Sequence, residues 1–316
     1  MQQATSKKSI LRIVSLALVL LLSVGALGIW AFAETASPMK GTSVSLGSEL
    51  VVNCYAEVTD TQDAAMTFGI GAQTKTVPVT QAQHVEGNLY SFPCTIAPAQ
   101  MTKTIEATLS DSGKTYQTST SVRAYAEKLF DSKQWDKLAA NDMMVATLNY
   151  GAATQEYFDY NIENLANAGY EKTATAEIPE VGAANMVSGS VSGISFYGAS
   201  LVFETRIAVR FYFAVSGNIA DYNFSIGEEP VYKNGLYYVE VPDINPQDYA
   251  TNITLTVNDA LTVTYSPMQY ISRMYGKTEN AELKALIGEL YQYHLTALDY
   301  LADPYGNDKD NLVSAQ

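Results

Sequence analysis

Gly41–Val58, GTSVSLGSELVVNCYAEV, recurs without a gap as Gly198–Val215, GASLVFETRIAVRFYFAV, and this repeat is the strongest indication of the fold. The identical pairs are Gly41/Gly198, Ser43/Ser200, Val52/Val209, Tyr55/Tyr212 and Val58/Val215. In both stretches apolar residues alternate with polar ones in the same phase. This period of two predicts a strand with one buried face. The chain is therefore predicted to contain two copies of one unit.

A second strand region repeats in the same order. Leu89–Cys94 (LYSFPC) aligns with Leu236–Val241 (LYYVEV), and Ala97–Leu109 (APAQMTKTIEATL) aligns with Asn245–Val257 (NPQDYATNITLTV). The matches keep the alternating pattern that is typical of short strands separated by turns. Each copy is therefore expected to contain several strands before any helix begins.

Helical segments complete each copy. Ser121–Phe130 aligns with Ser266–Tyr275, and Leu148–Phe158 aligns with Tyr291–Leu301. The two serines that open the first pair are good N-caps. Apolar stripes with helical spacing run along the longer helices, at Met143, Ala146, Tyr150, Ala153 and Tyr157, and at Leu286, Leu290, Tyr293, Ala297 and Tyr300. Such stripes, with tyrosines at matching positions, predict helices that dock on the sandwich of their own copy.

Strands followed by helices predict an α+β fold made of two tandem repeats, each an antiparallel, Ig-like β-sandwich followed by a two-helix hairpin. The predicted organisation is a signal peptide (1–33), a linker (34–42), β-sandwich 1 (43–120), helical hairpin 1 (121–168), a linker (169–193), β-sandwich 2 (194–265), helical hairpin 2 (266–303) and a flexible tail (304–316). The second linker is rich in small residues, Gly and Pro.

The N-terminus carries the features of an export signal. Lys7, Lys8 and Arg12 give it positive charge, an apolar run follows, and Ala31-Phe32-Ala33 precedes Glu34. Small residues at the first and third positions of that triplet suit signal peptidase, so Ala31 and Ala33 mark the predicted cleavage site. The alternative is an uncleaved membrane anchor, since about 20 apolar residues span a bilayer. Both interpretations place the rest of the chain outside the cytoplasm, secreted or at the cell surface.

The two cysteines, Cys54 and Cys94, fall in the first strand region and align with Phe211 and Val241. Both therefore occupy core-facing positions. Outside the cytoplasm a disulfide persists, so a Cys54–Cys94 disulfide across the core is predicted. Two separate buried thiols, packing as small hydrophobic side chains, are the alternative.

Composition limits the classes of partner. The chain has 316 residues, 47% of them hydrophobic and 16% charged, with a formal net charge of −14. These values are typical of folded domains. The negative charge disfavours binding to nucleic acid and to anionic lipid surfaces, so contact with a membrane is expected only through an uncleaved N-terminal segment.

Several stretches resemble a known but uncharacterised module. Leu148–Ala168 (LNYGAATQEYFDYNIENLANA), with Ser121–Leu129 before it, resembles a module of secreted and surface proteins of gut Clostridia and related Firmicutes. Gly193–Phe213 and Asn234–Asp248 resemble the second half of the same proteins. The resemblance implies β-sandwich units with helical hairpins on exported bacterial proteins. It implies no activity, cofactor or catalytic residue.

The sequence lacks the common catalytic and metal-binding motifs. Neither a GxSxG nucleophile motif nor an HExxH motif is present, and no metal site or cofactor is expected. His84 and His294 are interpreted as exposed and non-functional. The acids Glu57, Asp60, Glu204 and Glu240 are interpreted as solvated charges on the strands. A secreted hydrolase with an unrecognised carboxylate pair is the alternative hypothesis.

Aromatic residues are the remaining candidates for ligand contacts. Tyr55, Tyr212 and Tyr238 point away from the buried strand faces, and Trp135 stands between the helices of the first copy. Outward aromatic side chains can stack on sugars or proteins, or can be covered by the helix pair. The sequence thus favours a non-catalytic extracellular binding or structural module. Its expected partner is a polysaccharide or a surface protein, and its oligomeric state is open.

Overall fold

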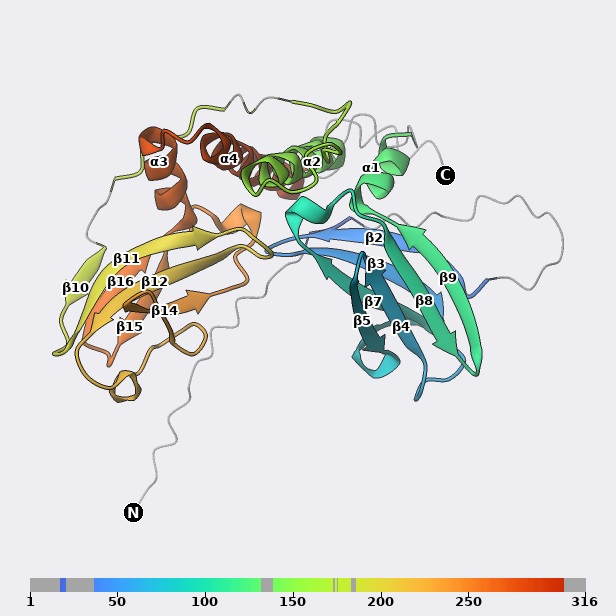
Figure 1. Ribbon diagram of the computed structural model, residues 1–316, viewed down its shortest axis with the longest axis horizontal. Helices are drawn as coiled ribbons and strands as arrows, with labels where there is room; N and C mark the ends of the chain where they lie inside the picture. The colour runs from blue at the N-terminus through green and yellow to red at the C-terminus, as the bar shows by residue number, and fades with distance from the viewer. Residues whose placement is uncertain are drawn as a thin grey trace, which may run out of the picture.

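The computed structural model describes residues 18–20, 37–131, 139–172, 174, 176–182 and 186–303. Within them the chain forms two halves, each with two antiparallel sheets followed by two helices (Figure 1). This confirms the α+β class and the predicted order of strands and helices in each half. None of the described α-helices is long and apolar enough to cross a membrane.

The first half contains one sheet in the order β1-β2-β3-β7-β6 and a second in the order β5-β4-β8-β9. Its strands are β1 (Leu18–Leu20), β2 (Met39–Leu46), β3 (Leu50–Glu57), β4 (Ala65–Ile70), β5 (Gln73–Pro78), β6 (Gln83–Glu86), β7 (Leu89–Ile96), β8 (Ile105–Asp111) and β9 (Lys114–Thr120). Its helices are α1 (Val122–Asp131) and α2 (Ala139–Tyr157), and a short 3-10 turn, η2 (Pro98–Gln100), follows β7. Strand β1 lies in the predicted signal peptide, so cleavage after Ala33 would leave β2 at the edge of its sheet.

The second half repeats this plan with sheets ordered β11-β12-β14-β13 and β10-β16-β15. Its strands are β10 (Val187–Gly189), β11 (Ile194–Val202), β12 (Ala208–Val215), β13 (Val231–Lys233), β14 (Leu236–Val241), β15 (Ile253–Val257) and β16 (Leu261–Tyr265). Its helices are α3 (Pro267–Lys277) and α4 (Ala281–Ala302), and η4 (Pro246–Asp248) is the counterpart of η2. Strand β10 lies within the predicted linker and pairs with β16.

Equivalent residues occupy equivalent places in the two halves. Tyr55 donates or accepts a hydrogen bond with Ser43 at 3.0 Å, and Tyr212 does the same with Ser200 at 3.2 Å. A register shift interrupts the pairing at matching positions, between Met39 and Gly41 in β2 and between Phe196 and Gly198 in β11. The ungapped alignment of the two stretches therefore describes the same local geometry.

The helix starts agree with the sequence. The hydroxyl of Ser121 accepts a hydrogen bond from the Ala124 N–H at 2.9 Å, and Ser266 forms a capping box with Gln269. Pro267 fills the first helical position, where a missing N–H costs nothing. The predicted stripes on α2 and α4 are buried over most of their length.

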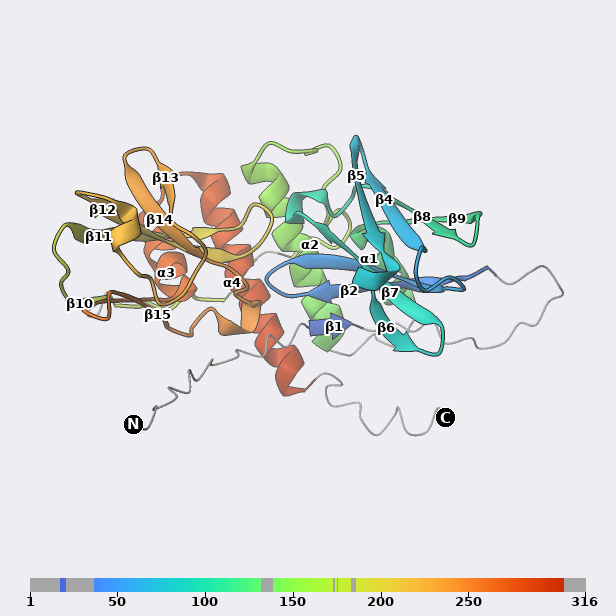
Figure 2. The ribbon, with the colours of Figure 1, turned by 90° about the horizontal axis from the view of Figure 1, so that it is seen from below.

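The buried stripes meet each other across the two halves, which corrects the predicted docking of each stripe on its own sandwich. Figures 1 and 2 show α2 and α4 lying side by side, and in Figure 1 they cover the junction of the two β-regions from above. The rings of Tyr150 and Tyr293, which occupy equivalent positions in the repeat, stack with centroids 5.6 Å apart. Glu49 and Arg206, also equivalent, form a β-bridge between the hairpin tips of the two halves. Contacts between equivalent residues are the mark of a local two-fold arrangement.

The predicted disulfide is absent: Cys54 and Cys94 are both free and buried. The two lie on neighbouring strands of one sheet, since Cys54 is opposite Phe92 and Cys94 is opposite Val52. They are thus diagonal neighbours on β3 and β7 and do not face each other across the core, as the prediction required.

Candidate ligand-binding site

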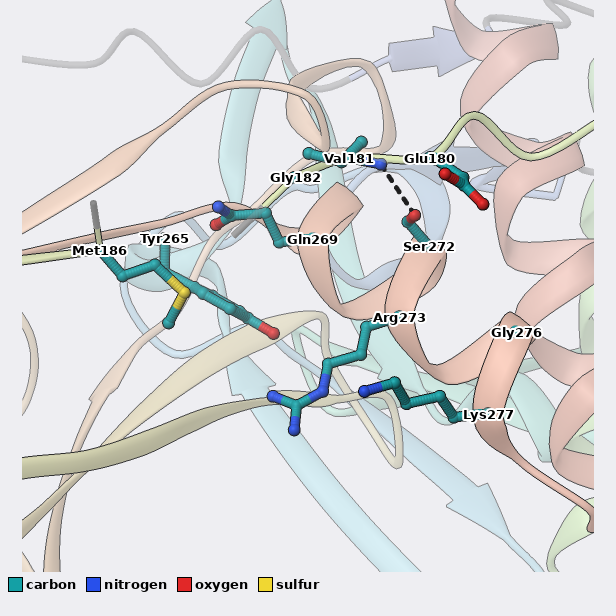
Figure 3. Close-up of a pocket in the computed structure, with 10 residues that line it drawn as sticks. All are labelled: Glu180, Val181, Gly182, Met186, Tyr265, Gln269, Ser272, Arg273, Gly276 and Lys277. Atoms are coloured by element: carbon teal, nitrogen blue, oxygen red, sulfur yellow. Dashed lines mark hydrogen bonds between the residues drawn. The ribbon is translucent and has the colours of Figure 1, made fainter. Parts of the chain in front are cut away.

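A cavity of about 720 Å³ lies between α3 and the segment that leads into β10 (Figure 3). The lining residues are Glu180, Val181, Gly182, Met186, Tyr265, Gln269, Ser272, Arg273, Gly276 and Lys277. Its volume falls within the range of small-molecule sites, about 300–1,000 Å³. One wall is therefore helical, and the other, the strap, consists of residues 180–182 and of Met186.

The helical wall follows from residue spacing. Gln269, Ser272, Arg273, Gly276 and Lys277 stand at positions i, i+3, i+4, i+7 and i+8, so they lie on one face of α3. The capping box at Ser266 fixes where the helix begins and so sets the direction of this face. The amide oxygen of Gln269 accepts the N–H of Ser266, which leaves its NH₂ group toward the cavity as a donor.

The strap is held by hydrogen bonds on both sides of the cavity. The Val181 N–H donates to the hydroxyl of Ser272 at 2.9 Å, drawn as the dashed line in Figure 3. The Thr264 N–H donates to the carbonyl of Met186 at 2.8 Å. These bonds tie the strap to α3 and to β16, so the cavity has two fixed walls.

Two cations enter this cavity without an acidic partner. In Figure 3 the guanidinium of Arg273 and the ammonium of Lys277 extend to the same side of α3. Among the described arginines, Arg123, Arg206 and Arg210 are ion-paired, whereas Arg273 has no ion pair with a described residue. Lys277 likewise has none within the described part of the chain.

Tyr265 supplies a hydroxyl beside these cations. Its side chain is 5% exposed and lines the cavity. Burial raises the pKa of Tyr265, and the negative charge that Tyr270 would carry on ionisation raises it further, while the positive charge of Arg273 lowers it. The hydroxyl therefore remains protonated at neutral pH and is available to donate a hydrogen bond.

The first copy has a different surface at this place. In the alignment Gln269, Ser272, Arg273 and Gly276 correspond to Ala124, Glu127, Lys128 and Asp131. Glu127 is tied to Arg123 by an ion pair of 2.8 Å. The corresponding face of α1 thus carries acids among its cations. In the described residues the equivalent helix faces of the two copies therefore differ, so the requirements of the shared fold do not explain the cationic face of α3.

The tyrosines predicted to contact ligands are partly buried and engaged within the protein. Tyr55 and Tyr212 bond the serines of their neighbouring strands, as described above. The ring of Tyr238 lies 5.8 Å from that of Tyr212, and the guanidinium of Arg210 covers it at 4.7 Å. The structure therefore brings Tyr212 and Tyr238 together, while Tyr55 lies in the other half. Trp135 lies outside the described residues.

More exposed tyrosines stand elsewhere on the second half, where the sequence did not single them out. Tyr232 is 62% exposed and its ring lies 5.0 Å from that of Tyr237, at the β13–β14 hairpin. Tyr197 is 73% exposed at the register shift in β11. A residue at such a register shift commonly turns outward, and the shift, which the structure shows, accounts for the exposure of Tyr197.

Glu240 was expected to be a solvated charge and is instead buried. Its carboxylate accepts hydrogen bonds from Arg206 Nε at 3.1 Å and from Arg210 Nε at 2.7 Å. Burial alone would raise the pKa of Glu240, but the hydrogen bonds and charges of the two arginines hold it below its usual value. The group is therefore an ionised structural partner of these arginines and is unsuited to act as a general acid at neutral pH.

One of the two histidines is exposed, as predicted, and the other is buried. His84 is exposed, as expected, and its Nε2 lies 3.0 Å from the Gly87 carbonyl. His294 is 4% exposed, so its predicted exposure is wrong. Its Nδ1 lies 2.5 Å from the carbonyl of Pro246, and its ring stacks on Tyr249 at 5.5 Å. His294 thus anchors α4 to η4, and burial lowers its pKa.

The two thiols and the carboxyl group of Glu289, whose pKa values are raised, are enclosed. Burial raises the pKa of Cys54 to about 12 and that of Cys94 to about 11, so both thiols stay protonated. Burial also raises the pKa of Glu289 to about 7, but the space beside it measures only about 10 Å³. Such a space holds at most about one water molecule. Within the described residues, no three His, Cys, Asp or Glu side chains gather in a way that could hold a metal ion.

Comparison with known proteins adds no further assignment. No protein-family model matches the sequence, and no curated protein is similar to it.

Proposed function

We propose that this chain is a non-catalytic binding module, exported to the outside of a bacterial cell, in which two Ig-like repeats form one rigid body. The observation that carries the proposal is the cavity of the second half, with Arg273 and Lys277, neither ion-paired to a described residue, along one wall. A ligand-sized cavity with a few converging polar groups is the usual form of a binding site.

The enclosure of the reactive groups supports binding over hydrolysis. Among the described residues, the protonated thiols and His294 are buried, and the space beside Glu289 measures only about 10 Å³. Arginine and lysine beside a cavity can hold an anionic group without transforming it. The predicted signal peptide supports placement outside the cell, where the proposed partner is a polysaccharide or a surface protein.

The contact between the halves supports the rigid arrangement. Tyr150 and Tyr293 stack within a continuous hydrophobic core that includes residues of both halves. The hairpin tips add backbone hydrogen bonds, among them Ile207 N–H to the Ser48 carbonyl at 2.8 Å. The second half therefore presents its cavity at a fixed position relative to the first, as a presenting scaffold requires.

The test is co-sedimentation of the chain from Glu34 onward with insoluble cell-wall polysaccharides and with mucin, together with a reducing-sugar assay on the same mixtures. The proposal expects the protein in the pellet and no release of sugar. Release of sugar by freshly purified protein would establish the hydrolase alternative, and protein that remains in the supernatant with every material would contradict a binding role for glycans.

A further inference from the structure

We infer that the cavity beside α3 binds a saccharide that carries a carboxylate, such as a uronic acid residue, with Arg273 and Lys277 as its anion-binding groups. This inference deepens the proposed function and rests on it. It names the chemical class of the ligand and the side chains that select it.

The positive charge of the cavity favours an anionic ligand. Arg273 and Lys277 are one helical turn apart and extend from the same face of α3, and neither has an acidic partner in the described part of the chain. Glu180 is the one acid in the lining, and the two cations outnumber it. Two like charges at this spacing repel each other, and a bound anion relieves that repulsion.

The geometry of the two cationic groups favours a carboxylate. A guanidinium presents parallel N–H donors whose spacing matches the two oxygens of a carboxylate. The lysine contributes a rotatable point charge that can approach the same group from another direction. The pair therefore suits a planar carboxylate held by the arginine and supported by the lysine.

The remaining lining favours a saccharide as the carrier of that carboxylate. The Gln269 NH₂ group and the Tyr265 hydroxyl are hydrogen-bonding groups on the cavity wall, and sugar hydroxyls both donate and accept. Gly276 has open space where a side chain would stand, so the wall between Arg273 and Lys277 is low. A ligand with many hydroxyls can thus follow the helix face between the two cations.

The second copy alone has this arrangement, and the first copy therefore supplies a matched control. Lys128 stands at the position of Arg273 in the repeat, is exposed, and lies on α1. Replacing Lys128 with Gln removes one positive charge from the equivalent helix, and the cavity is untouched. Any effect of net charge alone would appear equally in this variant.

The experiment is calorimetric titration of the chain from Glu34 onward with trigalacturonic acid and with its trimethyl ester. The wild-type chain is expected to bind the acid and not the ester, with affinity that weakens as sodium chloride is added. Arg273→Gln and Lys277→Gln are each expected to raise the dissociation constant about tenfold or more, because each removes a charge-assisted hydrogen bond. Lys128→Gln is expected to bind as the wild type does.

Three outcomes would overturn the inference. The first is an absence of binding to trigalacturonic acid at millimolar concentration; if sedimentation with polysaccharides persists, the proposed function survives and only the ligand class fails. The second is binding that Arg273→Gln and Lys277→Gln leave unchanged, which would place the site elsewhere. The third is equal binding of tri-glutamate, which would remove the saccharide from the inference. Thermal unfolding of each variant excludes misfolding, since the substituted side chains are exposed.

Discussion

Replacing Tyr249 with Phe is expected to stabilise the protein. The Tyr249 side chain is fully buried against His294, and its hydroxyl has no hydrogen-bond partner among the described residues. Burial raises the pKa of Tyr249, and the nearby hydroxyls of Tyr150 and Tyr293 raise it further. The group is therefore a neutral hydroxyl that is removed from water and forms no hydrogen bond with a described residue.

The magnitude follows from two opposing contributions. An unpaired buried hydroxyl costs about 1–3 kcal/mol relative to water. Removing its oxygen leaves a void smaller than a methyl group, which costs less than about 1 kcal/mol. Tyr249→Phe should therefore raise the free energy of unfolding by about 1 kcal/mol and the melting temperature by about 2 °C.

The control is the same change at a hydroxyl that has a partner. Tyr150 donates to the carbonyl of Phe203 at 3.4 Å, so Tyr150→Phe removes a hydrogen bond and should cost about 1 kcal/mol. Urea unfolding of both variants and of the wild type, followed by tyrosine fluorescence and circular dichroism, gives the comparison. A loss of stability in Tyr249→Phe equal to that in Tyr150→Phe would refute the reasoning and show that the Tyr249 hydroxyl bonds a buried water.

Three further changes have clear expected results. The pKa of Glu289 in the folded protein is about 7, above its unfolded value, so the protein loses stability as the pH rises toward 7 and this buried carboxyl group ionises. Glu289→Gln should therefore raise the free energy of unfolding by about 1–2 kcal/mol at pH 8 and change it little at pH 4. Urea unfolding at the two pH values measures the difference. Cys54 and Cys94 should react with a thiol reagent at pH 8 only after denaturation; rapid reaction of the native chain would contradict their burial. Gly151→Ala places a Cβ 2.5 Å from the sulfur of Met101 and should lower the melting temperature despite the better helix propensity of Ala; an unchanged melting temperature would show that Met101 moves aside freely.

Strand register was predictable because it depends on a local pattern. The alternation in Gly41–Val58 and Gly198–Val215 specifies which side chains enter the core, and the identical Ser–Tyr pairs specify a shared geometry. The N-cap serines and Pro267 were predictable for the same reason, since capping involves only neighbouring residues. These features require no knowledge of distant contacts.

The contact between the halves was not predictable from the stripes on α2 and α4. A stripe shows that one face of a helix is buried and leaves open whether a sheet or another helix covers it. The burial of His294 did have a signal, because it shares a helical face with Leu290 and Ala297. Because histidine is polar, it was not counted as part of the apolar stripe on this helix.

The cationic cavity was missed for a different reason. Arg273 and Lys277 are ordinary residues of an amphipathic helix, and only the structure shows that no acid in its described part pairs with them. Glu240 is the converse case, since its alternating position predicts exposure while two arginines cover it. Ion pairing depends on contacts between distant segments, and a single sequence does not record them.

The most direct test of this account is a crystal structure of the chain from Glu34 onward in complex with trigalacturonic acid. We expect the structure to show a sugar carboxylate against the guanidinium of Arg273, with the Lys277 ammonium beside it and both halves arranged as in the free protein. A saccharide bound instead on the exposed ring of Tyr232 and the half-buried ring of Tyr237 beside it, with the cavity beside α3 empty, would contradict it.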